Sequence, residues 1–387
     1  MHMLNRLLST LTPLVLATFA QGEVVVRHVP SEYPSINIAV GGSKSGDIIK
    51  IAAGAYYENV MVVGKGLTFL ADGEVTVYPK SDGPVFTVND NPQQYMVEFN
   101  GLTITTVVQS GRVPHGIRFD NGHAIQMENA WVQVTACRFI DCSVGYESET
   151  VSQSGAAIDA TLSHVWVEES WFVNCRADYG GAIACIGGTL DIRESIFTGN
   201  YVDYDGGSVI SALADVTLNQ VRFVENWAGG QGGHLTVYGG TLFMKRSRFT
   251  EGFAVDGGAV MVQGYWGSAP TASMQQCRFE NNVAFSGTDV WKQTAGLGPY
   301  MFNATYCGTN GSQGGILPAW QLPVTDSCDA CISDADFDET TDMRDLLDVL
   351  EHWGEMDPFT DLGGNGTTGH SDLQMVLWGY GGCLQLD

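Results

Sequence analysis

Positively charged residues are scarce in this chain, which has 18 Lys and Arg against 43 Asp and Glu among its 387 residues. The formal net charge of −25 argues against binding to nucleic-acid backbones, because such proteins neutralise phosphates with basic side chains. It suits a solvated extracellular protein, including one that uses divalent cations. We therefore expect no nucleic-acid partner.

Charged residues of either sign make up only 16% of the chain, whereas hydrophobic residues make up 44% and glycine accounts for 48 positions. Disordered chains combine high charge with few apolar residues, so this composition argues against disorder. It indicates a sheet-rich, turn-rich globular protein.

Long hydrophobic runs are also absent after residue 20, and we expect no membrane span. The single apolar run, Leu7 to Phe19, is too short for a good span; it follows Arg6 and ends near Ala20, a small residue suited to cleavage. We interpret residues 1–20 as a signal peptide and expect a secreted or cell-surface protein. Nine cysteines would then permit disulfides, with one thiol left over.

A unit of about 26 residues repeats through the middle of the chain. Phe197, Phe223 and Phe249 are spaced 26 and 26 residues apart, and glycine pairs such as Gly206-Gly207 repeat in step. Apolar residues alternate within each unit, which is the period of a strand. A unit this short cannot bury its apolar side alone, so the repeat predicts parallel stacking of successive coils.

Stacking places equivalent residues in columns, about 4.8 Å apart along the axis. Besides the phenylalanines, the frame predicts one small-residue column and one turn column, whose asparagine amides would hydrogen-bond from coil to coil. The small-residue column is Ser170, Ser195, Val221, Ser247 and Cys277, and the turn column is Cys175, Asn200, Asn226 and Asn282. Five cysteines fall inside the repeats, where we expect small buried core residues: Cys137, Cys142, Cys175, Cys185 and Cys277.

These repeats resemble the right-handed parallel β-helix family, the pectin-lyase-like superfold. The strings "SGDIIKIAAGAYYENV" and "GKGLTFLA" are similar to that family's opening coil, where a short amphipathic segment caps the helix end. The "GGA" and "F-x-x-N" units resemble repeats of polymorphic outer-membrane proteins. We therefore expect an all-β, right-handed parallel β-helix solenoid over residues 21–310.

The resemblance is weak for activity, since this superfold hosts lyases, hydrolases, esterases, tailspikes and adhesins. Polygalacturonase-like and pectinesterase-like catalytic strings are missing, and His115 in "PHGIRFD" lacks its partner motifs. Two hypotheses stay open. One is a non-catalytic module that binds extracellular polysaccharide or a cell-surface component; the other is a polysaccharide lyase or glycoside hydrolase.

Three arginines precede the phenylalanine of successive coils: Arg222, Arg248 and Arg278. By strand alternation their side chains should face outward, about 5 Å apart. They would form a stripe for a carboxylated or sulfated polysaccharide, or else pair with acidic residues two positions on, such as Glu280. Outward aromatics, Trp227 and Trp166 among them, would stack on sugar rings or simply be exposed.

A second group of polar residues flanks the glycine pairs. Asp205 and His234 should approach within about 5–8 Å on neighbouring coils, close enough for acid–base catalysis or cation binding. Asp256 lies at the next equivalent corner. The alternative is turn chemistry on a solvated rim.

The repeat fades into a Gly- and Pro-rich linker at residues 311–327, and an acidic tail follows. In "DADFDETTDMRD" the acids stand at positions 1, 3, 5, 9 and 12, the alternation that aims oxygens at Ca²⁺. A similar loop recurs 27 residues later, and each loop precedes an apolar helical stripe. The candidate Ca²⁺ ligands are Asp334, Asp336, Asp338, Thr340, Asp342, Asp345, Asp361, Asn365, Thr367 and Asp372.

These tandem loop-helix units resemble a divergent dockerin domain over residues 328–387. The resemblance implies a small α-helical calcium-loop domain with a cohesin-like or cell-envelope partner. Glu339 replaces the turn glycine of loop one, and glycines stand at positions 3 and 9 of loop two. The recognition positions hold Met343-Arg344 and His370-Ser371 instead of the family's small hydroxyl pairs.

Overall fold

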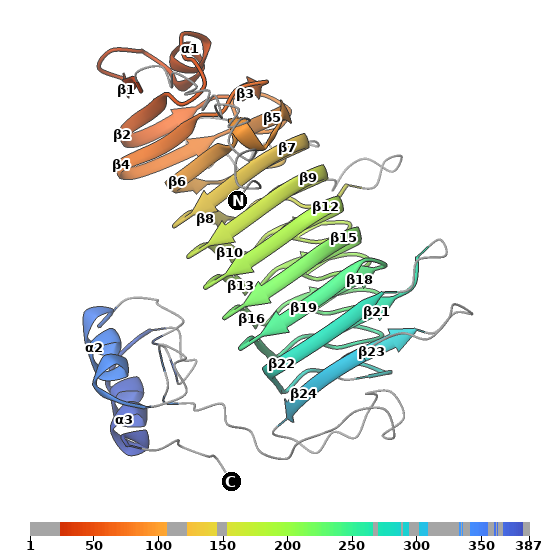
Figure 1. The fold of residues 1–387 in the computed structure, drawn as a ribbon. Coiled ribbons are helices and arrows are strands. Elements are labelled where there is room, and N and C mark those ends of the chain that lie inside the picture. The colour runs from red at the N-terminus through yellow and green to blue at the C-terminus, as the bar shows by residue number, and fades with distance from the viewer. Residues whose placement is uncertain are drawn as a thin grey trace, which may run out of the picture.

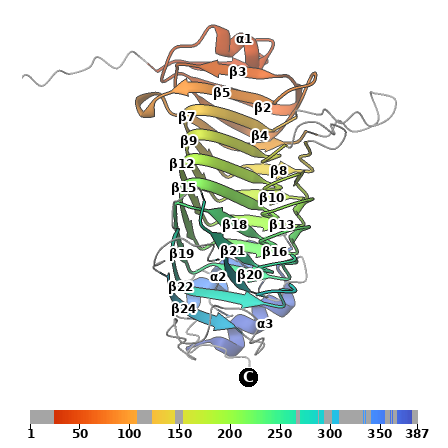
Figure 2. The same ribbon diagram turned by 90° about the vertical axis from the view of Figure 1, so that its right-hand side faces the viewer.

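In a computed structural model, the described residues are 24–106, 122–144, 153–265, 270–287, 289–293, 302–308, 333, 335, 341–354, 360, 362 and 367–381. Twenty-one strands form one continuous sheet, and the strand pairs along it are parallel. The strands stack in successive coils along one axis (Figures 1 and 2). The chain is a parallel β-helix. The proposed signal peptide and linker lie outside the described residues.

The first coils contain β1 (Val26–Val29), α1 (Ile36–Gly41), β2 (Ile48–Tyr57), β3 (Val60–Val63), β4 (Thr68–Tyr78), β5 (Phe86–Asn91), the 3-10 helix η1 (Gln93–Tyr95) and β6 (Val97–Ile104). The middle coils contain β7 (Ile125–Thr135), β8 (Arg138–Ile140), β9 (Ile158–Glu168), β10 (Trp171–Val173), β11 (Arg176–Ala177), β12 (Ile183–Arg193), β13 (Ile196–Thr198) and β14 (Tyr201–Val202).

The later coils contain β15 (Val209–Asn219), β16 (Arg222–Val224), β17 (Trp227–Ala228), β18 (Leu235–Tyr238), β19 (Thr241–Lys245), β20 (Arg248–Thr250), β21 (Val260–Gln263), β22 (Thr271–Glu280), β23 (Val290–Gln293) and β24 (Phe302–Gly308). Helix α1 covers the N-terminal end of the stack (Figure 2), where Ile36, Ala39 and Val40 are buried. It is the capping segment that the opening coil predicts.

Each coil turns at corners held by residues with positive φ. In β12 the bend falls at Gly187 and Gly188, and in β15 at Leu213. The next corner is formed by Glu194 in one coil and by Gln220 in the following coil. A left-handed backbone costs roughly 1–2 kcal/mol for a residue with a Cβ. The bends divide each coil into short straight segments that continue the ladders of the coils before and after.

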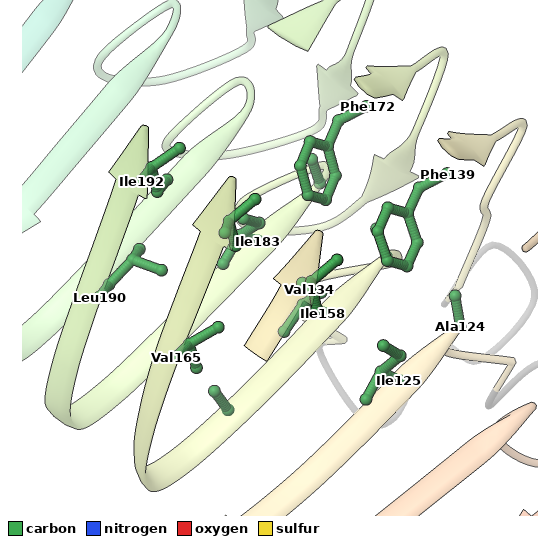
Figure 3. Close-up of a cluster of buried hydrophobic side chains, with 14 of the residues drawn as sticks. Ala124, Ile125, Val134, Phe139, Ile158, Val165, Phe172, Ile183, Leu190 and Ile192 are labelled. Atoms are coloured by element: carbon green, nitrogen blue, oxygen red, sulfur yellow. The ribbon is translucent and has the colours of Figure 1, made fainter. Parts of the chain in front are cut away.

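The phenylalanine column forms the centre of the stack, as the repeat predicts. Phe139, Phe172, Phe197 and Phe223 lie with ring centroids 4.8, 4.5 and 4.8 Å apart, and the stack continues through Phe249. Figure 3 shows two of these rings beside the aliphatic side chains of the neighbouring strands. The five cysteines inside the repeats are buried free thiols, as expected.

The predicted asparagine ladder is also present. Asn200 Nδ2 donates to Asn226 Oδ1 at 2.9 Å, and the same oxygen accepts the backbone N–H of Asn200. Asn282 Nδ2 donates to the Phe249 carbonyl at 3.0 Å. Buried amides are thus satisfied between coils.

The tail contains two helices, α2 (Met343–Glu351) and α3 (His370–Gly379), whose surroundings repeat at the predicted interval of 27 residues. Ser333 and Thr341 hydroxyls lie 2.6 Å apart, and the equivalent Thr360 and Thr368 hydroxyls lie 2.7 Å apart. A small core packs four residues from equivalent positions: Ala335, Val349, Leu362 and Val376. Within the described part of the chain, no helix has the length and apolar character to cross a membrane.

Candidate functional site

A cavity of about 460 Å³ opens on the outward face of β7, β9 and β12. Its walls include two tryptophans, one amide, two carboxylates and one guanidinium: Trp131, Trp166, Gln133, Glu168, Asp191 and Arg193. Gln93, the first residue of η1, and Met96, the residue before β6, also line the cavity. A concave site lined by aromatic residues with a few polar groups is typical of ligand binding.

Strand register brings these side chains together. Trp131 pairs with His164 across β7 and β9, and Gln133 pairs with Trp166. One coil further, Trp166 pairs with Asp191, and Glu168 with Arg193. Because alternate residues of a strand face the same side, the inward neighbours fill the core while these residues face outward.

The aromatic wall consists of Trp131 and Trp166, and His164 stacks on Trp131. Trp131 and His164 have ring centroids 3.9 Å apart at 29°, and Trp166 lies 5.2 Å from Trp131 at 31°. His164 Nδ1 lies 2.9 Å from Thr189 Oγ1. Burial lowers the pKa of His164 and favours its neutral form, which stacks on an indole without an added charge.

The charged wall is formed by β12 and the end of β9. The Nε and Nη2 atoms of Arg193 donate to the two carboxylate oxygens of Asp191 at 3.0 and 2.8 Å. The hydrogen bond to Asp191 raises the pKa of Arg193. At the adjoining corner, burial and then the charges of Glu169 and Glu168 raise the pKa of Glu194. The surroundings of the cavity are therefore predominantly anionic.

The structure corrects the expectation of an exposed arginine stripe. Arg222 and Arg278 are buried, with 6% and 8% of their surface exposed. Arg248 Nη2 donates to Glu280 Oε2 at 2.9 Å, and Arg278 forms an ion pair with the other oxygen of Glu280. The alternative of pairing with the acid two positions on holds for Arg278, whereas Arg248 pairs with the same Glu280 from the preceding coil. These arginines present little free surface to a polysaccharide.

The expected acid–base pair of Asp205 and His234 is not formed. His234 is fully buried: its Nδ1 lies 2.9 Å from Asn226 Nδ2, and its Nε2 lies 3.2 Å from Asn282 Oδ1. The His234 ring bridges the coil in which Gly252 stands in place of an asparagine of the ladder. Burial lowers the pKa of His234 to about 3, so the ring is neutral. The assignment of His234 to a solvent-facing catalytic site was wrong, because the residue after the glycine pair faces the core.

Asp205 lies at a half-buried corner and has other partners. Its carboxylate accepts the Gln231 backbone N–H at 2.8 Å and the Tyr238 hydroxyl at 2.6 Å. Burial, then the hydrogen bond with Asp205, raises the pKa of Tyr238. The carbonyl of Asp256 accepts the Gly232 N–H at 2.9 Å. These contacts are those of turn residues on a rim.

Trp227 is a poor platform for a sugar ring. Its ring centroid lies 4.4 Å from that of Tyr201 on one side and 5.9 Å from that of Phe253 on the other, and both neighbouring rings are nearly parallel to the indole. Both faces of the indole are therefore occupied. The sequence did indicate Trp166, but it missed Trp131 and His164, whose 33-residue spacing differs from the 26-residue repeat.

Of the candidate calcium ligands, four lie in the described residues: Asp342, Asp345, Thr367 and Asp372. Asp345 is fully buried, and its oxygens accept the backbone N–H groups of Ala335 at 2.5 Å and Asp342 at 2.6 Å. Asp372 Oδ2 accepts the N–H of Gly369 at 2.8 Å, equivalently. Each position-12 carboxylate thus caps the first turn of its helix by accepting backbone N–H groups.

The remaining candidates lie outside the described residues: Asp334, Asp336, Asp338, Thr340, Asp361 and Asn365. Within the described ranges, no group of three or more His, Cys, Asp or Glu side chains is placed to hold a metal ion.

Comparisons with known proteins add two distant similarities. No protein-family model matches the chain. A segment of 79 residues, 20% of the chain, is 33% identical to metabotropic glutamate receptor-like protein P of Dictyostelium discoideum and spans 6% of that protein. The A-module of mannuronan C-5 epimerase AlgE4 from Azotobacter vinelandii aligns over 75% of this chain and 92% of the module, with 12% identity and a TM-score of 0.32. The architecture therefore rests on the strand pairings of the chain itself.

Proposed function

We propose that the chain is a secreted or cell-surface protein that binds an extracellular polysaccharide in the Trp131–Arg193 cavity. The observation that carries this proposal is the pair of tryptophans, Trp131 and Trp166, beside hydrogen-bonding side chains in one opening of about 460 Å³. The cavity has room for a few sugar rings within the usual range for ligand sites.

Sugar rings present apolar C–H faces and a rim of hydroxyl groups. Trp166 and the face of Trp131 that does not stack on His164 complement the first feature, since aromatic rings supply large, rigid apolar area. Gln133, Glu168 and the Asp191–Arg193 pair supply donors and acceptors for the hydroxyl groups. The coils extend the sheet face beyond the cavity, so a chain lying along the axis would meet further outward polar residues.

For the tail we propose a calcium-stabilised attachment module. Its two loop-helix units place buried Asp345 and Asp372 at equivalent positions, each holding backbone N–H groups of its own unit. The acid alternation in the preceding loop supplies the hard oxygens that Ca²⁺ requires. A cohesin-like or cell-envelope protein is the partner that such a tail would take.

A binding screen tests the main proposal. The full-length mature protein is run through gels that contain single polysaccharides, and retardation by at least one of them is expected. A Trp131→Ala, Trp166→Ala double variant with an unchanged circular dichroism spectrum should run without retardation. Equal retardation of both proteins would refute the site. Soluble products released from the bound polysaccharide would assign a lyase or hydrolase activity instead of binding alone.

A further inference from the structure

We infer that the cavity selects against acidic polysaccharides and prefers a sugar chain that carries free, positively charged amino groups. This inference rests on the proposed function, because it names the substrate class of that same site. It departs from the arginine-stripe hypothesis, which predicted a carboxylated or sulfated ligand.

The first argument is the charge balance of the cavity walls. Two carboxylates, Glu168 and Asp191, line the opening against one guanidinium, Arg193. That guanidinium is already held by both oxygens of Asp191, at 3.0 and 2.8 Å. Glu168 stands opposite Arg193 in the strand register. A carboxylated sugar would therefore meet a cation whose charge is already balanced.

The second argument is the wider ring of acids. Glu98 on β6 stands opposite Gln133, so a further carboxylate borders the cavity on the strand before it. Glu169 and Glu194 form the adjoining corner on successive coils. Placing uronate carboxylates or sulfates among these groups would add like-charge repulsion, which costs affinity and slows association.

The third argument is the fit of an ammonium group. An ammonium close to Glu168 would form a charge-assisted hydrogen bond that a hydroxyl group cannot match. The same group near the face of Trp131 or Trp166 would be attracted by the ring quadrupole. Both contacts lie within one opening, so neighbouring sugars of a single oligomer would reach them together.

The test compares four oligosaccharides of similar length by isothermal titration calorimetry at pH 6. They are a de-N-acetylated amino-sugar oligomer, its fully N-acetylated form, a neutral glucan oligomer and an oligogalacturonate. We expect the free-amine oligomer to bind about two- to fivefold more tightly than the neutral oligomers, and the oligogalacturonate to bind most weakly. Raising the salt from 50 to 500 mM should remove most of that preference.

Two variants locate the effect. Glu168→Gln should bring the affinities for amine and neutral oligomers together, because it lowers the amine affinity much more than the neutral affinity. Glu128→Gln, an exposed site on the same strand as Trp131 but outside the cavity lining, should leave both affinities unchanged. If Glu168→Gln folds poorly, Asp191→Asn provides a second test of the charge preference.

Each outcome decides the inference. Equal binding of amine and neutral oligomers, or tighter binding of the oligogalacturonate, would overturn the charge preference while the proposed polysaccharide site stands. A preference for amines that survives Glu168→Gln and Asp191→Asn would overturn the assignment to these carboxylates. Absence of binding by all four oligomers, and in the gel screen, would overturn the proposed function with it.

Discussion

The imidazole of His234 occupies the space that a side chain at position 252 would need. A Cβ on Gly252 would lie 2.5 Å from His234 Nε2 and 2.3 Å from the carbonyl oxygen of Gly258. In the same coil the ring bridges Asn226 and Asn282, which are otherwise separated by the coil that lacks an asparagine. A side chain at position 252 and the imidazole of His234 would thus compete for the same space in the core.

This pairing predicts a specific double-mutant cycle. Gly252→Asn alone should destabilise the fold by about 2–4 kcal/mol through overpacking and displacement of the imidazole. His234→Ser alone should cost a similar amount, since it leaves a cavity and buried amides without partners. The double variant places an asparagine in the ladder beside a serine. The same arrangement exists in another coil, where Asn200 Nδ2 donates to Ser208 Oγ at 3.3 Å.

Urea unfolding of the four proteins measures the coupling. The double variant should lose less stability than the sum of the two single variants, with a coupling free energy of at least about 1 kcal/mol. Strictly additive losses would show that the two positions do not share one space.

The same histidine predicts a pH dependence of stability. Its pKa is about 3 in the fold against 6.5 as the ordinary value, so the unfolded chain binds a proton first as the pH falls. Stability present above pH 6.5 is therefore lost between about 6.5 and 3, by up to about 1.4 kcal/mol per pH unit. The Gly252→Asn, His234→Ser variant lacks this contribution. Its free energy of unfolding should approach that of the wild type as the pH falls, and a constant difference would contradict the assignment.

The carboxylate of Glu280 is the shared partner of two arginines, Arg248 and Arg278. Burial, then the charge of Arg248, lowers the pKa of Arg278, so this group depends on its counter-ion. Glu280→Gln should cost about 3–5 kcal/mol in thermal or urea unfolding. Glu251→Gln, at an exposed corner of the preceding coil, should cost under about 0.5 kcal/mol. Equal effects would contradict the role given to Glu280.

Calcium should stabilise the tail and leave the β-helix transition unchanged. In calorimetry, excess Ca²⁺ should raise the unfolding temperature of the smaller transition relative to EDTA. The stabilisation free energy should be about 2.7 kcal/mol at a Ca²⁺ concentration of a hundred times the dissociation constant. Asp334→Asn with Asp336→Asn should abolish most of this shift, because it removes two charges from loop one. An identical transition in Ca²⁺ and EDTA would refute the metal proposal.

Periodic features of the fold could be predicted from the sequence. Phe197 and Phe223 stand 26 residues apart and stack at 4.8 Å, because a constant interval repeats the same position on successive coils. The Asn200–Asn226 hydrogen bond follows from the same interval. The 27-residue repeat of the tail likewise appears as paired hydroxyl contacts.

Features that break the period could not be predicted in this way. Strand alternation predicts that successive side chains point to opposite faces. After a glycine corner, however, it does not show which residue points inward, and the prediction placed His234 on the solvent side. Likewise, Arg222 faces away from the phenylalanine core yet is buried. The Trp131–His164 stack joins coils of unequal length, so no constant spacing marks it.

The most direct measurement of the central claim is the affinity of the best polysaccharide ligand for two matched tryptophan variants. Trp131→Ala opens the cavity wall, whereas Trp227→Ala removes a ring whose faces Tyr201 and Phe253 already cover. Calorimetric titration should show a loss of about ten- to hundredfold for Trp131→Ala and less than twofold for Trp227→Ala. Equal affinities, or a greater loss for Trp227→Ala, would contradict binding at the Trp131–Arg193 cavity.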